Sequence, residues 1–210
     1  MRNWALIGLA AIVCAAPVAA QAPNAGLLAK QEAAMKALAF LDGEWRGLAQ
    51  AYEPGGVLNM TQTERSGTLL GGTIRLIEGR SFDDDGKTIF NAFAVISYDV
   101  PRSRYSITSH ASGYSTTAEL KVRADGFSWE IPAGPGAKVE FEATVARGIW
   151  TEIGHYVGAD GTRRKTFDMR VERIGATARP AGGDARPKAR CKARNASRET
   201  LEQCRRAAKD

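Results

Sequence analysis

The spacing of apolar residues changes at Gly43, and this change constrains the fold more than any other feature. Residues 24–40 carry apolar side chains three to four positions apart, as an amphipathic helix does, with Asn24 as its N-cap. From residue 44 onward the period is two, which is typical of strands with one buried face. Gly43 permits a sharp turn at the junction, and the ring of Trp45 can fill one end of a small closed barrel. The pattern therefore predicts an all-β fold with an N-terminal helix.

About ten segments fit the strand pattern, and turns rich in Gly, Pro and Asp separate most of them. They are residues 44–53, 58–66, 73–82, 88–99, 104–112, 116–123, 127–131, 138–145, 149–157 and 165–174. Strands at this spacing without intervening helices predict an antiparallel up-and-down barrel, because closure removes exposed strand edges. Such a barrel either encloses a ligand or is filled by its own side chains.

Alternation identifies the inward face of two strands. The apolar sets predicted to point inward are Val139, Phe141, Ala143 and Val145, and Phe167, Met169 and Val171. In residues 149–157 both faces are partly apolar, so alternation leaves the inward face open.

The N-terminus has the pattern of a secretory signal peptide. Arg2 precedes an apolar run over residues 5–16, and the small residues Val18, Ala19 and Ala20 precede the expected cleavage after Ala20. The sequence thus predicts four parts: signal peptide 1–20, helical segment 21–41, barrel 42–175 and tail 176–210. The mature chain is predicted to be periplasmic or secreted and to contain no transmembrane segment.

The net charge of +6 comes from the tail. Residues 177–210 hold ten Lys or Arg and four Asp or Glu, whereas residues 21–176 hold eighteen basic and nineteen acidic side chains. The nearly neutral body argues against nucleic-acid binding. The tail, poor in large apolar residues, is predicted to be disordered. It would bind an anionic membrane surface, a polyanionic glycan or an acidic partner, or would only be solvated. Its Cys191 and Cys204 would form a disulfide or stay free thiols.

An ordered set of short motifs runs through the predicted barrel. The motifs are Phe40-Leu41-x-Gly43-x-Trp45-x-Gly47, Thr63-Glu64-Arg65, Leu70-Gly71-Gly72-Thr73, Ile77-Glu78-Gly79-Arg80, Ser97-Tyr98-Asp99, Trp129-Glu130 and Trp150-x-Glu152-x-Gly154. This set resembles a bacterial family known only as a domain of unknown function, which is similar in architecture to calycins, the lipocalin-like barrels. The resemblance covers residues 38–175 and implies an antiparallel barrel of about ten strands. Related calycin barrels bind fatty acids, other apolar molecules or haem, which is an analogy of fold.

The sequence contains no Gly-x-Ser-x-Gly elbow, phosphate-binding loop, His-Glu-x-x-His or Cys-x-x-Cys, and it has only two histidines. We therefore predict no catalytic residue, metal site or cofactor, and a binding protein is favoured over an enzyme.

Two charged residues are candidates for contact with a ligand. Glu78 and Arg80 share a strand face with Ile74 and Leu76, and this face would be interior. Arg80 would then hold the carboxylate of an apolar acid; alternatively, it forms an ion pair with Glu78 or with a neighbouring strand.

Other candidates are aromatic or histidine side chains. The aromatic residues expected to line a cavity are Trp45, Phe93, Tyr98, Tyr105, Trp129 and Trp150. His155, more than His110, is a candidate haem ligand or general base, or else an ordinary hydrogen-bonded histidine.

The leading hypothesis is an exported barrel that binds a small, mostly apolar ligand. The alternatives are an envelope interaction or scaffold protein that acts through its basic tail, and a barrel that binds haem or nitric oxide through His155.

Overall fold

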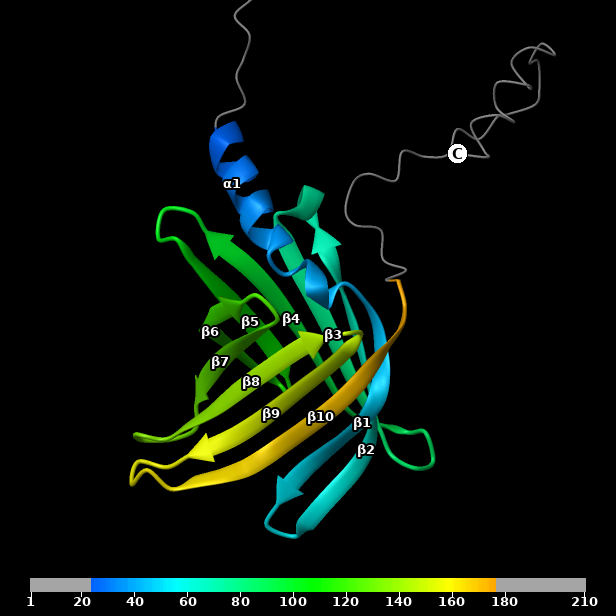
Figure 1. The fold of residues 1–210 in the computed structure, drawn as a ribbon. Coiled ribbons are helices and arrows are strands. Elements are labelled where there is room, and N and C mark those ends of the chain that lie inside the picture. The colour runs from blue at the N-terminus through cyan, green and yellow to red at the C-terminus, as the bar shows by residue number, and fades with distance from the viewer. Residues whose placement is uncertain (1–23, 177–210) are drawn as a thin grey trace, which may run out of the picture.

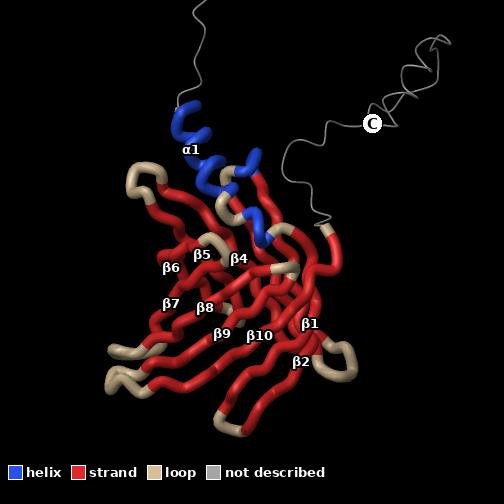
Figure 2. Tube along the Cα trace, in the orientation of Figure 1, coloured by secondary structure: helices blue, strands red, loops and turns tan. Residues whose placement is uncertain are grey.

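The computed structural model describes residues 24–176. The predicted signal peptide and the basic tail with Cys191 and Cys204 lie outside the described residues. The described chain forms one helix, two short 3-10 turns and ten strands (Figures 1 and 2). The helical elements are α1 (Ala25–Lys36), η1 (Ala39–Leu41) and η2 (Leu70–Gly72). The strands are β1 (Gly43–Glu53), β2 (Gly56–Leu69), β3 (Ile74–Phe82), β4 (Thr88–Asp99), β5 (Arg104–Ala111), β6 (Tyr114–Arg123), β7 (Gly126–Pro132), β8 (Lys138–Ala146), β9 (Ile149–Val157) and β10 (Arg163–Gly175).

The strands form a closed antiparallel barrel in which each strand pairs with its neighbours in sequence. The pairing of β1 with β10, from Glu44 opposite Gly175 to Ala51 opposite Phe167, closes the sheet. This architecture confirms the predicted fold class. The strand boundaries follow the turn residues, because Gly and Asp supply the backbone conformations that tight antiparallel connections require.

Helix α1 and turn η1 lie over one end of the barrel, which we call the closed end (Figure 1). The Asn24 carbonyl begins the helix by accepting hydrogen bonds from the N–H groups of Leu27 and Leu28, while its side chain makes no capping bond. Tyr105 Oη donates to the Ala34 carbonyl at 2.8 Å, and Gln31 Nε2 donates to the Tyr98 carbonyl at 3.0 Å. These bonds attach the helix to the turn between β4 and β5.

The junction between η1 and β1 is the turn that the sequence predicted. Gly43 has φ of 131°, and a Cβ atom there would lie 2.7 Å from the Gly175 carbonyl oxygen, so only glycine fits. Trp45 is 1% exposed, and its Nε1 donates to the Leu41 carbonyl at 3.1 Å. The guanidinium of Arg173 lies 4.3 Å from the Trp45 ring centroid and donates to the Phe40 and Asp42 carbonyls. The closed end is thereby sealed.

The main hydrophobic core fills the barrel beneath α1. Its members are Met35, Leu38, Leu41, Trp45, Ala49, Met60, Ile77, Ile96, Ile107, Leu120, Phe127, Ala143, Val145, Trp150, Met169 and Val171. The inward sets predicted for β8 and β10 are confirmed, since Ala143, Val145, Met169 and Val171 belong to this core. One buried cation, Arg75, is paired there with Asp42 at 2.6 Å. No helix within residues 24–176 is long and apolar enough to cross a membrane.

Candidate functional site

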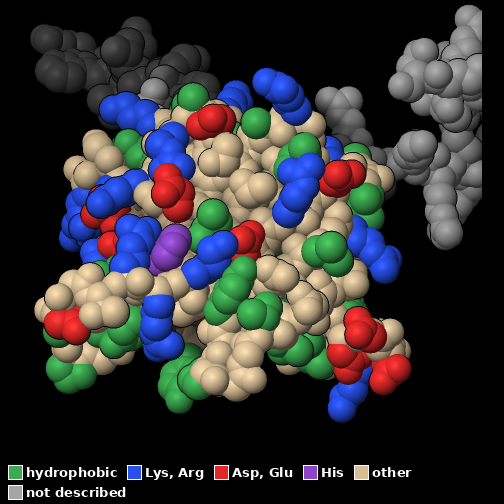
Figure 3. All heavy atoms as spheres, turned by 60° about the horizontal axis from the view of Figure 1, so that its bottom comes forward, with side chains coloured by type: hydrophobic (Ala, Val, Ile, Leu, Met, Phe, Trp, Pro, Cys, Tyr) green, Lys and Arg blue, Asp and Glu red, His purple; other side chains and the backbone are tan. Residues whose placement is uncertain are grey.

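The barrel interior is hollow toward the end away from α1, where it encloses a cavity of about 560 Å³. Every strand except β6 contributes to its lining, which is mostly apolar. Leu58, Ile89 and Phe90 line the cavity and are each about 40% exposed (43%, 39% and 41%), so the cavity reaches solvent at this end. We call it the open end. Figure 3 turns this end toward the viewer and shows Lys and Arg interspersed with Asp and Glu over the outer surface.

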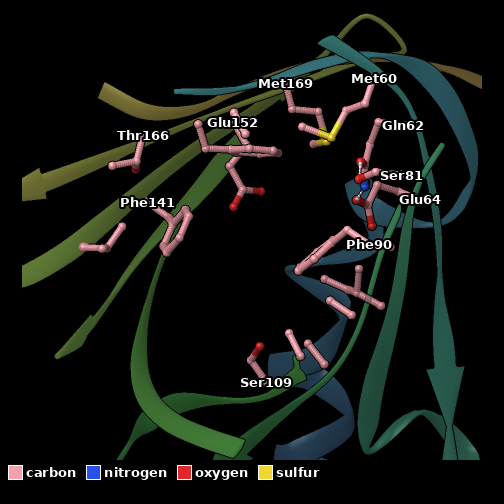
Figure 4. A pocket seen from close by; sticks show the side chains of 18 of the residues that line it. Met60, Gln62, Glu64, Ser81, Phe90, Ser109, Phe141, Glu152, Thr166 and Met169 are labelled. Carbon is pink, nitrogen blue, oxygen red and sulfur yellow. Dashed lines mark hydrogen bonds between the residues drawn. The ribbon is translucent and has the colours of Figure 1, made fainter. Parts of the chain in front are cut away.

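The first polar group in the cavity is the Glu64 carboxyl, which β2 directs inward. Gln62 Nε2 donates to Glu64 Oε1 at 2.6 Å, and Ser81 Oγ donates to Gln62 Oε1 at 2.5 Å (Figure 4). Burial raises the pKa of Glu64 from its ordinary value of 4.5 to about 8. The negative charges of Glu152 and Glu78 act in the same direction, and the hydrogen bond from Gln62 opposes them. Glu64 thus takes up and releases a proton near neutral pH.

The second polar group in the cavity is the carboxyl of Glu152 on β9, which points into the same cavity as Glu64 (Figure 4). Burial raises its pKa from 4.5 to about 7, while the indole N–H groups of Trp129 and Trp150 favour the charged form. Trp150 Nε1 is nevertheless buried and makes no hydrogen bond of ordinary geometry to any described residue. Two glutamates that titrate near neutral pH therefore share one largely apolar cavity.

Two glycines leave room for larger side chains of the cavity lining. Gly79 pairs with Glu64 across β2 and β3, and a Cβ atom there would lie 2.8 Å from Glu64 Oε1. Gly154 lies between Phe141 and Phe167, and its Cβ atom would come within 3.0 Å of both side chains. Each glycine thus permits a larger neighbour to occupy the interior.

A β-bulge in β10 adds one more polar group to the wall. The pairing register with β9 skips Thr166, so Thr166 and Phe167 both line the cavity although they are consecutive. Thr166 Oγ1 is buried and has no hydrogen-bond partner in the described part of the chain. The bulge thereby adds a residue with a buried hydroxyl group to a lining that is otherwise mostly apolar.

Aromatic rings form much of the remaining wall. Trp129 and Phe141 are stacked with centroids 4.6 Å apart and an interplanar angle of 17°. Trp150 contacts Phe127 on one side and Trp45 on the other in edge-to-face geometry, with centroids 6.1 Å and 5.8 Å apart. Trp150 therefore connects the packed core to the cavity.

The structure brings together only part of the predicted site. Trp129 and Trp150 line the cavity, whereas Trp45 is buried in the core at the closed end. Tyr98 and Tyr105 form a cross-strand pair, with ring centroids 4.7 Å apart, and lie near α1. Their positions serve the attachment of the helix rather than the cavity.

Glu78 and Arg80 lie on the outside of the barrel. The inward positions of β3 are Ile77, Gly79 and Ser81, so the neighbouring side chains point outward. Arg80 Nη2 and Glu78 Oε1 form an ion pair at 2.5 Å, which is the alternative that the sequence left open. The pair borders a shallow outer groove that also contains Phe93 and His110. Arg80 is thus not positioned to hold a ligand in the cavity.

His155 also lies outside the cavity, because the inward positions of β9 are Trp150, Glu152 and Gly154. Its Nδ1 lies 3.2 Å from Arg163 Nη2. Partial burial and the charges of Arg163 and Lys165 lower the pKa of His155. A group bound within the cavity would not reach this imidazole, so the structure gives no support to His155 as an axial ligand.

Sequence reasoning missed Glu64, Gln62, Ser81 and Glu152 as site residues. The segment Thr61-Gln62-Thr63-Glu64-Arg65-Ser66 is polar at every position, so no apolar alternation marks its inward face. The sequence did hold a signal for Glu152. It shares a strand face with Trp150, and if this tryptophan is buried, Glu152 must also point inward.

No protein-family model and no curated protein sequence matches the chain. The fold is similar to that of Rv2717c from M. tuberculosis, with a TM-score of 0.52 and 12% identity over 67% of this chain and 96% of that one. An S-type phycobiliprotein lyase, CPES from Guillardia theta, has a TM-score of 0.46 and 11% identity over 70% of this chain and 96% of that one. At such identities the first likeness concerns the fold alone, and the second is too distant to carry an argument.

Proposed function

We propose that the protein binds one small, mostly apolar molecule inside the barrel, which the ligand reaches through the open end. The observation that carries this proposal is the cavity of about 560 Å³, which is lined mainly by apolar and aromatic side chains. Ligand sites in proteins have volumes of roughly 300–1,000 Å³ and combine an apolar lining with a few polar groups. The carboxyls of Glu64 and Glu152 are such groups.

The cavity also explains why the apolar surface at the open end is tolerated. Leu58, Ile89 and Phe90 keep about 40% of their surface exposed (43%, 39% and 41%) at its mouth. A bound apolar ligand would remove part of that surface from water, at about 25 cal/mol per Å². The ligand would thus gain affinity mainly from burial, and the glutamates would orient it.

Energy transfer to a neutral hydrocarbon tests the proposal directly. Pyrene bound in the cavity would lie near Trp129 and Trp150, so tryptophan emission should fall and pyrene emission should appear on titration. The variant Ala92→Phe fills the lining opposite Gly79 and should abolish the signal. Asn91→Phe adds the same ring to the outer face of the same strand and should leave the signal unchanged. Equal pyrene binding by both variants would reject the cavity as the binding site.

We also propose that the protein is exported, on the basis of Arg2, the apolar run 5–16 and the small residues up to Ala20. N-terminal sequencing of protein from the periplasmic fraction should begin at Gln21. A chain that retains Met1 would contradict export. Membership of the family with the Phe-Leu-x-Gly-x-Trp-x-Gly opening stays a prediction.

A further inference from the structure

We propose that the ligand is an apolar organic cation, an amine whose ammonium group lies between the carboxylates of Glu64 and Glu152. This inference rests on the proposed function, because it specifies the class of molecule that the cavity accepts. It differs from the fatty-acid analogy that the fold alone suggests.

The charge of the lining is the first reason. Among the described residues that line the cavity, the only ionisable side chains are Glu53, Glu64 and Glu152, and no Lys, Arg or His accompanies them. The arginine expected to hold a carboxylate, Arg80, is paired with Glu78 on the outside. The buried cation Arg75 is paired with Asp42 at the closed end. An anionic ligand would therefore find no positive charge in this lining, whereas a cation can pair with the carboxyls of Glu64 and Glu152 as they ionise.

The protonation state of Glu64 and Glu152 is the second reason for proposing a cation. Burial disfavours their charged forms, and the charge of Glu152 further disfavours that of Glu64. An ammonium group between them removes this penalty, because a buried charge is tolerated when it is paired and hydrogen-bonded. A bound cation would therefore offset the free-energy cost of ionising the two carboxyls in the apolar cavity, and the resulting ion pairs would contribute to its affinity.

The unpaired polar atoms of the wall fit the same ligand. Trp150 is 2% exposed, and its Nε1 lacks a hydrogen-bond partner of ordinary geometry in the described part of the chain although Glu152 is near. When Glu152 is ionised by a bound cation, it becomes a stronger acceptor for this N–H. Thr166 Oγ1 is also buried and has no hydrogen-bond partner within residues 24–176, and rotation of this side chain toward the cavity would let it accept a hydrogen bond from an ammonium N–H.

The aromatic wall suits both ends of such a molecule. The stacked pair Trp129 and Phe141, together with Phe90 and Phe167, offers apolar contact for a hydrocarbon body. Their ring faces also attract a nearby cation, which prefers the π-face of an aromatic ring. An apolar amine uses both properties, whereas a neutral alcohol uses only the first.

The hydrogen-bond chain from Ser81 through Gln62 holds the Glu64 carboxyl in place. Gln62 is 3% exposed and Ser81 is 1% exposed, and neither contributes charge. Gly79 leaves the space that the carboxyl occupies. The strand pair β2–β3 therefore carries residues that position one acidic group in an apolar space, as a specific contact requires.

Competition among three ligands with the same chain tests the proposal. Pyrene is bound to the full-length protein at pH 7.5 and displaced by decylamine, decanol or decanoate. Decylamine should bind about tenfold more tightly than decanol, the factor that corresponds to one charge-assisted hydrogen bond, and decanoate should bind most weakly. Glu64→Gln and Glu152→Gln should each remove most of the advantage of the amine and leave the affinity for decanol within about twofold. Glu172→Gln, on the outer face of β10 where the Glu172 side chain is 69% exposed, serves as the matched control and should leave all three affinities unchanged.

The outcomes separate the two proposals. If decanol displaces pyrene as well as decylamine does, or if decanoate binds most tightly, the cation proposal is rejected while binding of an apolar ligand stands. If pyrene itself does not bind and tryptophan emission ignores all three ligands, the proposed function is rejected as well. If only one glutamine variant folds, that variant alone decides, because either glutamate is expected to contribute.

Discussion

The two ends of the barrel use the same strands for opposite purposes. At the closed end the inward side chains of β1, β8 and β10 belong to the packed core, and Trp45 is only 1% exposed. At the open end the same strands line a cavity of about 560 Å³, into which the half-buried Glu64 and Glu152 point. The packing that stabilises the fold is therefore concentrated at the closed end. The open end contains a cavity and polar side chains that folding alone does not require.

The largest effect is expected at the closed end from Trp45→Ala. The change removes a fully buried ring that packs edge-to-face on Trp150 and beneath Arg173. The free energy of unfolding should fall by about 3–5 kcal/mol. Urea denaturation followed by circular dichroism measures the loss. Trp129→Ala, in the cavity wall, should cost clearly less, and equal losses would show that the two ends are not divided as described.

A smaller loss of stability is expected from substitution of Gly47, and hardly any from substitution of Gly79. A Cβ atom at Gly47 would lie 2.2 Å from the backbone carbonyl oxygen of Arg170, so Gly47→Ala must displace β1 from β10. We expect a loss of about 1–3 kcal/mol in the free energy of unfolding. At Gly79 the clash is with the end of the Glu64 side chain, which can move. Thermal denaturation should therefore show little change for Gly79→Ala, whereas its affinity for decylamine should fall. The reverse order of stability would contradict this reasoning.

The pH dependence of stability should identify the buried carboxyl. Because the pKa of Glu64 is near 8 in the folded state and near 4.5 when the chain is unfolded, the folded state holds an additional proton between these values. Its contribution to the free energy of unfolding is therefore lost as the pH rises through this window. Relative to Glu64→Gln, the wild type should lose about 1–2 kcal/mol between pH 5 and pH 8, since water in the cavity reduces the full 1.36 kcal/mol per unit. Parallel curves for the two proteins would show that Glu64 is ionised throughout.

The smallest effect is expected outside the barrel. Arg80→Ala breaks an ion pair with Glu78 in which the Arg80 side chain is 54% exposed. Exposed pairs contribute about 0–1 kcal/mol to stability. Neither the midpoint of urea denaturation nor the affinity for pyrene should change appreciably. A marked loss of ligand binding would restore Arg80 as a site residue and contradict the outward position.

The sequence was sufficient for the fold because its signals are local. The Gly- and Asp-containing turns and the alternation in β8 and β10 require no knowledge of distant residues, and they predicted ten strands and their order. The interior of β3 was not predictable in the same way. Ile74 and Leu76 on one face and Ile77 on the other are all apolar, so alternation does not decide which face is inward.

Predicting the site requires knowing which face points inward in several strands at once. Glu64 and Glu152 become a pair only when both β2 and β9 have a known inward face and when the two strands are placed around the barrel. A glutamate on a strand is also expected at the surface, because charged side chains are seldom buried unpaired. Sequence patterns therefore directed attention to Arg80 and His155, which are common types of ligand-binding residue, and away from the two acids that face the cavity.

The pairing of β1 with β10 has a kinetic consequence for the site. All other strand pairs join neighbours in the chain, so they can form without a long loop closure, whereas β1 and β10 meet from opposite ends of the described chain. Glu64 on β2 and Glu152 on β9 lie on either side of this junction. An open sheet in which β1 and β10 are separated would hold the two carboxyls apart. A ligand bound between them would span the junction and should slow its opening, so hydrogen exchange of the β1 and β10 amides should report occupancy of the cavity.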